Sequence, residues 1–125
     1  MSLHNTLVAT YAQPRLAEID LDKMQQAGFD FRKLRIITHQ PQRIAEQCRH
    51  APVLGSFGDL EVDYFGCIPE QEIAGYEAEL GTGHLFIVAH GMPGEIEQAK
   101  RIANSTHPTS WDGQADATIY YGCMD

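Results

Sequence analysis

The sequence predicts a single α/β domain, in which strands alternate with helices over one shared sheet. The chain has 125 residues, the length of one domain. Two of its segments have similar sequences, "LVATYAQPRLAEI" from residue 7 and "IITHQPQRIAEQC" from residue 36. Each runs from an apolar, β-branched stretch through a proline into a helical pattern. A third unit of this kind covers 84–104.

Strands are predicted from short runs rich in β-branched and apolar residues that are bounded by turn residues. They cover residues 6–11, 34–39, 84–90 and 117–122. The last follows a loop-like segment, so residues 105–125 are expected to form a loop and a strand at an edge of the sheet. In 58–65 apolar residues alternate with acidic ones, which favours a further, half-exposed strand.

Helices are predicted from apolar residues at helical spacing, each opened by a proline whose missing N–H is not needed in the first turn. The helices begin at Pro14, Pro41, Pro69 and Pro93. Gly28 suits the residue after the first helix, where φ is positive, so that helix covers 14–27. The second stops near His50, because Pro52 disfavours a helical conformation before it. The helix after Pro69 has no strand just before it and is expected to connect the two halves.

Composition excludes several classes of partner. The formal net charge is −8, and an acidic surface repels both the phosphate backbone of nucleic acids and anionic lipid. No apolar run approaches the length of a membrane span, and no signal peptide is visible. Three cysteines at wide spacings, Cys48, Cys67 and Cys123, indicate reduced thiols. We therefore expect a cytoplasmic protein that binds neither nucleic acid nor membrane.

Two longer stretches carry a family resemblance. With Cys67 skipped, "GCIPEQEIAGYEAELGTGHLFIVAH" and, before it, "LVATYAQPRLAEIDLDKMQQAGFDFRKLRIITH" resemble the small bacterial family of general or heat-induced stress proteins, over about 6–104. The resemblance implies a βαβ-α-βαβ ferredoxin-like sandwich, with a four- to five-stranded sheet covered by helices. It implies no settled activity and no catalytic residues. Members often have a Gly/Ala-rich segment between the halves, where this chain has the polar and aromatic "RHAPVLGSFGDLEVDYFGC".

Candidate ligand-binding residues stand where the strands end. Tyr11, His39 and His90 each lie two or three positions before a helix-opening proline. If all strands are parallel, the three side chains meet at one sheet edge, where helix N-termini favour anions. If the third strand is antiparallel, Tyr11 and His39 share one edge, His84 comes near them and His90 lies at the far edge. Imidazoles there could bind a small anion or a metal; alternatively, each histidine merely ends its strand.

The sequence contains no local motif for a metal, a cofactor or catalysis. It has no HxH, HExxH or CxxC spacing, no P-loop and no GxSxG elbow. The glycines of "GTGHL" follow a helix and precede a strand, the reverse of a dinucleotide-binding turn. Asp59, Glu61 and Asp63 could hold a cation, but such a row is typical of the wet side of an edge strand. We assign no catalytic residue, no metal ligand and no cofactor.

The leading functional hypothesis is a non-enzymatic domain that acts through self-association, most simply as a dimer, or through a partner. The tail "ATIYYGCMD" offers an association surface, because Tyr120 and Tyr121 point to opposite faces of a strand. Trp111 in the preceding loop could be an interface anchor or a lid. A role in a bacterial stress response comes from the resemblance alone. The alternative is a sensor that binds a small ligand or metal through Tyr11, His39 and either His84 or His90.

Overall fold

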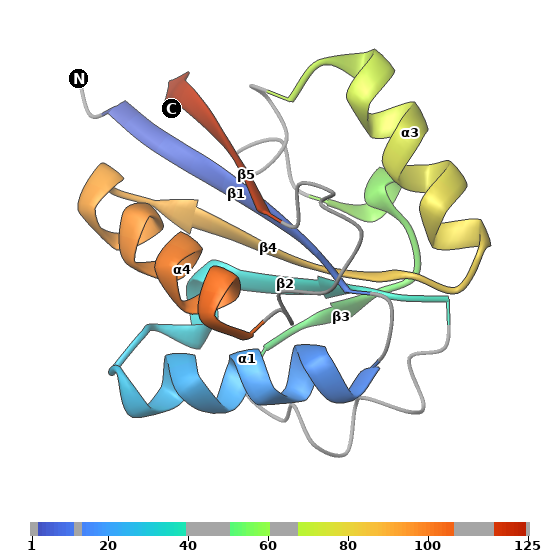
Figure 1. Cartoon of the computed structure of the whole chain (residues 1–125). Helices are drawn as coiled ribbons and strands as arrows, with labels where there is room; N and C mark the ends of the chain where they lie inside the picture. Colours follow the sequence, from blue (N-terminus) through green and yellow to red (C-terminus); the bar gives the residue numbers. More distant parts are fainter. Residues whose placement is uncertain (1–2, 12–13, 40–50, 61–67, 107–116, 125) are drawn as a thin grey trace.

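A computed structural model of the chain describes residues 3–11, 14–39, 51–60, 68–106 and 117–124 (Figure 1). In these ranges the strands are β1 (Leu3–Tyr11), β2 (Leu34–Ile37), β3 (Val53–Leu54), β4 (Leu85–Gly91) and β5 (Ala117–Met124). The α-helices are α1 (Pro14–Gln26), α3 (Glu70–Gly81) and α4 (Pro93–Thr106). Short 3-10 turns cover Phe31–Lys33 and Phe57–Asp59.

The strands form one mixed sheet in the order β3-β2-β4-β1-β5. β4 runs antiparallel to both of its neighbours, β1 and β2, and β5 runs antiparallel to β1. Among the described strands, only the short pair of β2 and β3 is parallel. This α+β arrangement is consistent in broad terms with a ferredoxin-like sandwich. The sequence allowed two arrangements of the strands. The arrangement with an antiparallel third strand is confirmed, and the all-parallel arrangement is wrong.

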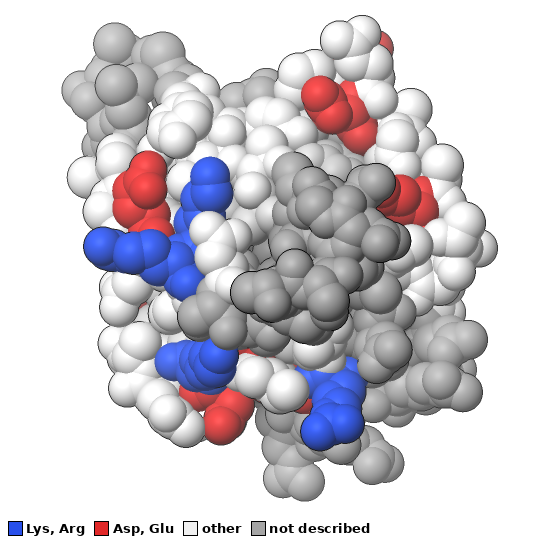
Figure 2. Space-filling model, in the orientation of Figure 1, with Lys and Arg blue, Asp and Glu red and all other residues white. Residues whose placement is uncertain are grey.

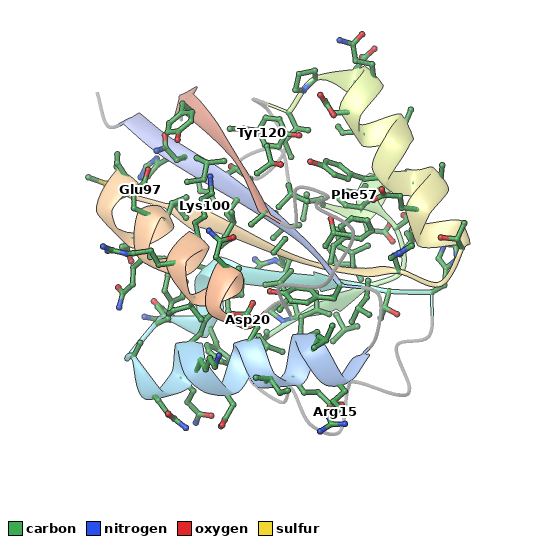
Figure 3. The ribbon with its side chains drawn as sticks, in the orientation of Figure 1. Arg15, Asp20, Phe57, Glu97, Lys100 and Tyr120 are labelled. Carbon is green, nitrogen blue, oxygen red and sulfur yellow. The ribbon has the colours of Figure 1, made fainter. Side chains whose placement is uncertain are left out.

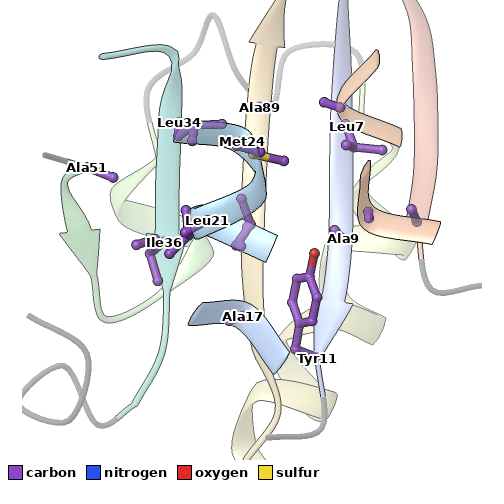
Figure 4. Packing of buried hydrophobic residues seen from close by; sticks show 14 of the residues in the cluster. Leu7, Ala9, Tyr11, Ala17, Leu21, Met24, Leu34, Ile36, Ala51 and Ala89 are labelled. Carbon is purple, nitrogen blue, oxygen red and sulfur yellow. The ribbon is translucent and has the colours of Figure 1, made fainter. Parts of the chain in front are cut away.

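Helices cover the two faces of the sheet unequally. α1 and α4 lie together on one face, and their apolar stripes close the larger core, part of which is seen in Figure 4. α3 packs on the opposite face with a second cluster built around Phe57 and Phe86. β4 lies between the two cores, and Leu85–Ala89 are all buried. Burial on both faces explains why this strand reads as a continuous apolar run.

Several predicted boundaries need correction. β1 begins at Leu3, earlier than the sequence predicts, and β2 ends at Ile37, before His39. The strand predicted over 58–65 is wrong at its start, because Phe57–Asp59 forms a 3-10 turn that brings Phe57 and Leu60 into the same core. The helix predicted after Pro41, the residues 61–65 and Trp111 lie outside the described residues.

Glycines with positive φ follow two of the helices, and the one after α1 is as predicted. Gly28 follows α1 with φ of 81°, and Gly83 follows α3 with φ of 102°. Both values lie in the left-handed region, which L side chains rarely adopt. These residues turn the chain from each helix toward the next strand, which is how α3 delivers His84 to the start of β4.

Candidate functional site

The strand register shows which of the predicted site residues come together. Tyr11 is paired with Leu85, so the end of β1 and the start of β4, which His84 precedes, lie at one end of the sheet. Ile37 is paired with Phe86, so His39 follows β2 at that same end. His90 is paired with Thr6, near the other end. The structure therefore separates His90 from the other three residues, as an antiparallel third strand requires.

Tyr11 belongs to the core and not to the rim of the sheet. Its side chain is fully buried beside Ala17 of α1 (Figure 4). Its hydroxyl donates a hydrogen bond to Oδ2 of Asp20, which is also fully buried and is labelled in Figure 3. This contact ties α1 to β1. Tyr11 is thus positioned to hold the helix on the sheet. The sequence had placed its side chain at the sheet edge as a candidate ligand-binding residue, and did not predict this contact.

His84 also has a structural partner of its own. Its Nδ1 lies 2.8 Å from Oγ1 of Thr82 and 3.2 Å from the carbonyl oxygen of Glu79. The Thr82 hydroxyl donates to the same carbonyl at 2.7 Å. The same carbonyl also accepts from the backbone N–H groups of Thr82 and His84, so the two side chains add to a helix end that the backbone already closes. His39 is exposed. A joint ligand site of Tyr11, His39 and His84 stays a prediction.

His90 lies in a different polar group, together with Thr6 and His4. Its Nδ1 is 3.0 Å from Oγ1 of Thr6. The rings of His4 and His90 have centroids 5.0 Å apart and are tilted by 43°. Both histidines are half-buried, whereas Thr6 is fully buried. The sequence-based prediction did not include His4, because it began the first strand at Thr6. The proximity of His4 to His90 could be recognised only once β4 was known to pair with β1.

A tyrosine pair joins α3 to the edge strand β5. The hydroxyl oxygens of Tyr76 and Tyr120 are 2.6 Å apart. The Tyr76 ring also stacks on Phe57 at 5.4 Å and meets the Phe86 edge at 5.4 Å. Burial is the main reason that the pKa of each tyrosine is raised. The hydrogen bond with Tyr76 raises the pKa of Tyr120 further, because it favours the neutral phenol.

These raised pKa values predict a loss of stability at alkaline pH. The pair contributes its full stability below the ordinary tyrosine pKa of about 10, and loses it as pH rises toward the higher folded pKa, because the unfolded chain releases its protons first. Urea unfolding at about pH 9 and about pH 11 should show a larger fall in the unfolding free energy for the wild type than for Tyr76→Phe/Tyr120→Phe. Equal falls in the two proteins would contradict this account.

Charges are distributed unevenly over the described surface. Acidic and basic side chains alternate over α1 and α4, whereas α3 shows acidic side chains without basic neighbours on the same face (Figure 2).

An ion pair joins the turn before β2 to the start of α4. Lys33 contacts both carboxylate oxygens of Glu95 at 2.9 Å and lowers the pKa of that carboxyl. Glu95 also accepts from the backbone N–H of Met92 at 3.2 Å, which caps the start of α4.

Within the described ranges, no group of three or more His, Cys, Asp and Glu side chains has the geometry of a metal site. No helix in the described part of the chain is long and apolar enough to cross a membrane.

No family model, curated protein or solved structure matches the chain. The likeness to bacterial stress proteins therefore stays a prediction.

Proposed function

We propose that this chain is a binding domain that works by pairing with a second copy of itself, through the outer edge of β5. The observation that carries the proposal is the position and composition of this strand. β5 is the terminal strand of the sheet, next to β1 alone in the described strand order. It spans eight residues, Ala117–Met124. An edge strand of this length presents a row of backbone donors and acceptors to any strand that approaches.

β5 has few of the features by which proteins protect sheet edges. Its sequence ATIYYGCM contains no charged residue and no proline. The opposite edge of the described sheet is β3, which has only two residues, Val53–Leu54, and offers little to pair with. The one irregularity of β5 is a register shift against β1 between His4 and Thr6. The regular part of the edge strand is therefore Ala117–Tyr120.

The side chains of β5 support association as well. Ala117 and Ile119 are buried against the larger core, and Tyr120 packs against the cluster under α3. Tyr121 is 66% exposed, the largest exposed fraction of any large hydrophobic side chain in the described residues. Aromatic side chains of this kind are enriched in protein interfaces, because one ring buries a large area at low entropic cost.

Pairing of β5 with β5 gives a closed, symmetric dimer. Two copies of one strand pair antiparallel about a two-fold axis, so each copy presents the same patch and both β5 edges are covered. The sheet then continues from one subunit into the other, as in other cases of strand addition. Each copy carries a net charge of −8, so we expect the dimer to tighten with added salt, which screens the repulsion.

Light scattering coupled to size exclusion tests the proposal. The wild type should elute with a mass near twice the 13.9 kDa of one chain. Tyr121→Glu replaces the exposed ring of this strand by a charge in each copy and should weaken dimerisation by about tenfold or more. Ile19→Glu is the matched control, because it also replaces an exposed large hydrophobic residue, on α1, and should leave the mass unchanged. A monomeric wild type at all concentrations would refute the proposal.

A further inference from the structure

The proposed pairing of β5 also determines how the two copies of α4 lie relative to each other. When two copies of one strand pair antiparallel, the two-fold axis is perpendicular to the sheet, so the same face of both sheets points the same way. α4 packs on β1, β4 and β5, and α1 packs beside it. Figure 1 shows α4 between α1 and the β5 edge. The two copies of α4 would therefore face each other, antiparallel, across the axis.

The sides of α4 have different neighbours. Three of its residues are fully buried against the sheet, Ile96, Ala99 and Ala103. On one flank of this buried stripe, Glu95 contacts Lys33 in the turn before β2, so this flank is turned away from β5. Helical spacing places Glu97 and Lys100 on the other flank, three residues apart and one above the other. Figure 3 shows both side chains on the side of α4 next to β1 and β5.

Glu97 and Lys100 are not engaged within one copy. Glu97 is exposed and Lys100 is half-buried. Among the described residues, neither side chain makes an ion pair or a hydrogen bond. Figure 2 shows an acidic and a basic side chain next to each other over this helix. Two-fold rotation brings the acidic position of one helix opposite the basic position of the other, so this flank is complementary to itself.

The position of the two charges along the sheet agrees with the position of the strand edge. α4 runs back along β4, with about 1.5 Å per helical residue against about 3.3 Å per strand residue. The midpoint between Glu97 and Lys100 therefore lies about level with Val88. The register across β1 carries this level to Thr118 of β5. Thr118 is within Ala117–Tyr120, the regular part of the edge strand, on which the two-fold axis would be centred.

The expected distance between the two helices suits long charged side chains. Neighbouring strands lie about 4.8 Å apart, and three such spacings separate β1 from β1 of the second copy. Because α4 lies over β1 and β5, the two helix axes would be about 10–14 Å apart, wider than the roughly 8–10 Å of directly packed helices. Glu97 and Lys100 can span this gap. Tyr121, which alternation places on the same face as Ile119, can fill the space beneath them.

We propose that Glu97 of each copy pairs with Lys100 of the other, and that these two reciprocal ion pairs fix the register of the β5 pair. The proposal rests on the proposed function. Backbone hydrogen bonds alone would allow an edge strand to slip by two residues, because the same faces still match after such a shift. Complementary charges at one level of the sheet favour a single register, and they favour a second copy of this chain over other exposed strands.

Charge reversal tests the ion pairs. Glu97→Lys brings like charges together twice in a homodimer, as does Lys100→Glu, so each should dimerise about tenfold more weakly than the wild type. An equimolar mixture of the two variants restores both pairs, and about 90% of its dimers should be mixed, against about half for random pairing. Glu97→Lys/Lys100→Glu should dimerise like the wild type. Native mass spectrometry, with one variant labelled with the heavy nitrogen isotope, measures the mixed fraction.

Asp22→Lys and Arg15→Glu are the matched control variants. They make the same changes in net charge at exposed positions of α1, away from the axis, and their mixture should contain random dimers. Circular dichroism shows whether each variant is folded. Equal fractions of mixed dimer in the two experiments would overturn the ion pairs and leave the pairing of β5 intact. A wild type that is monomeric at all concentrations would refute both.

Discussion

Replacing Phe86 by alanine is expected to lower the free energy of unfolding by about 3–5 kcal/mol, the range for removing a buried aromatic side chain. Phe86 is fully buried in the centre of the cluster between the sheet and α3. Its ring meets Phe57 edge-on, with centroids 5.0 Å apart and an angle of 75°, and meets Tyr76 at 5.4 Å. Alanine removes both ring contacts and leaves a cavity that the surrounding strands cannot close.

Phe86→Leu is the matched variant for this prediction. It keeps an apolar side chain in the cluster and should cost less, about 1–2 kcal/mol. Urea unfolding followed by circular dichroism measures both changes. A loss below about 1 kcal/mol for Phe86→Ala would mean that α3 does not pack on the sheet as described, since a large buried side chain cannot be removed from a well-packed core at so little cost.

Tyr11→Phe should have the second-largest effect, a loss of about 1.5–3 kcal/mol, which is the range for a hydrogen bond to an ionisable partner. Both Tyr11 and Asp20 are fully buried, so water cannot replace the phenol as the donor to the carboxyl. The substitution removes only the hydroxyl and keeps the ring in the core, which separates the hydrogen bond from packing.

The control for this prediction is Tyr121→Phe. It makes the same chemical change at a side chain that is 66% exposed, and should shift stability by less than about 0.5 kcal/mol. Equal effects of Tyr11→Phe and Tyr121→Phe in urea unfolding would contradict the role assigned to the Tyr11–Asp20 contact. The double variant Tyr11→Phe/Asp20→Leu should recover part of the loss, because it removes the buried carboxyl as well.

Local patterns predicted most elements of the fold. The prolines at 14 and 93 open α1 and α4, as expected from the first helical turn, and Pro69 is the residue just before α3. The apolar run before Pro93 is β4, buried on both faces. What failed was the start of the strand predicted over 58–65, because Phe57 and Leu60, three residues apart, enter one core through a turn. Period two and period three cannot be told apart over so few residues.

The candidate site was less accessible to sequence reasoning, because it depends on strand direction. Tyr11, His39 and His90 occupy equivalent places in their segments, yet an antiparallel β4 puts His90 beside Thr6 and away from the other two. The burial of Tyr11 was not predicted for another reason. Strand alternation turns its side chain toward α1, where Asp20 receives its hydroxyl. The pairing of His4 with His90 joins residues 86 positions apart, and only the register reveals it.

The central claim is that β5 forms the contact between two copies of the chain. An isotope-filtered nuclear Overhauser experiment on mixed labelled and unlabelled protein tests it most directly. We predict intermolecular contacts between backbone protons of 117–121 in one copy and the same residues in the other, in the alternating pattern of an antiparallel pair. Intermolecular contacts confined to other elements, or none at all, would contradict the account.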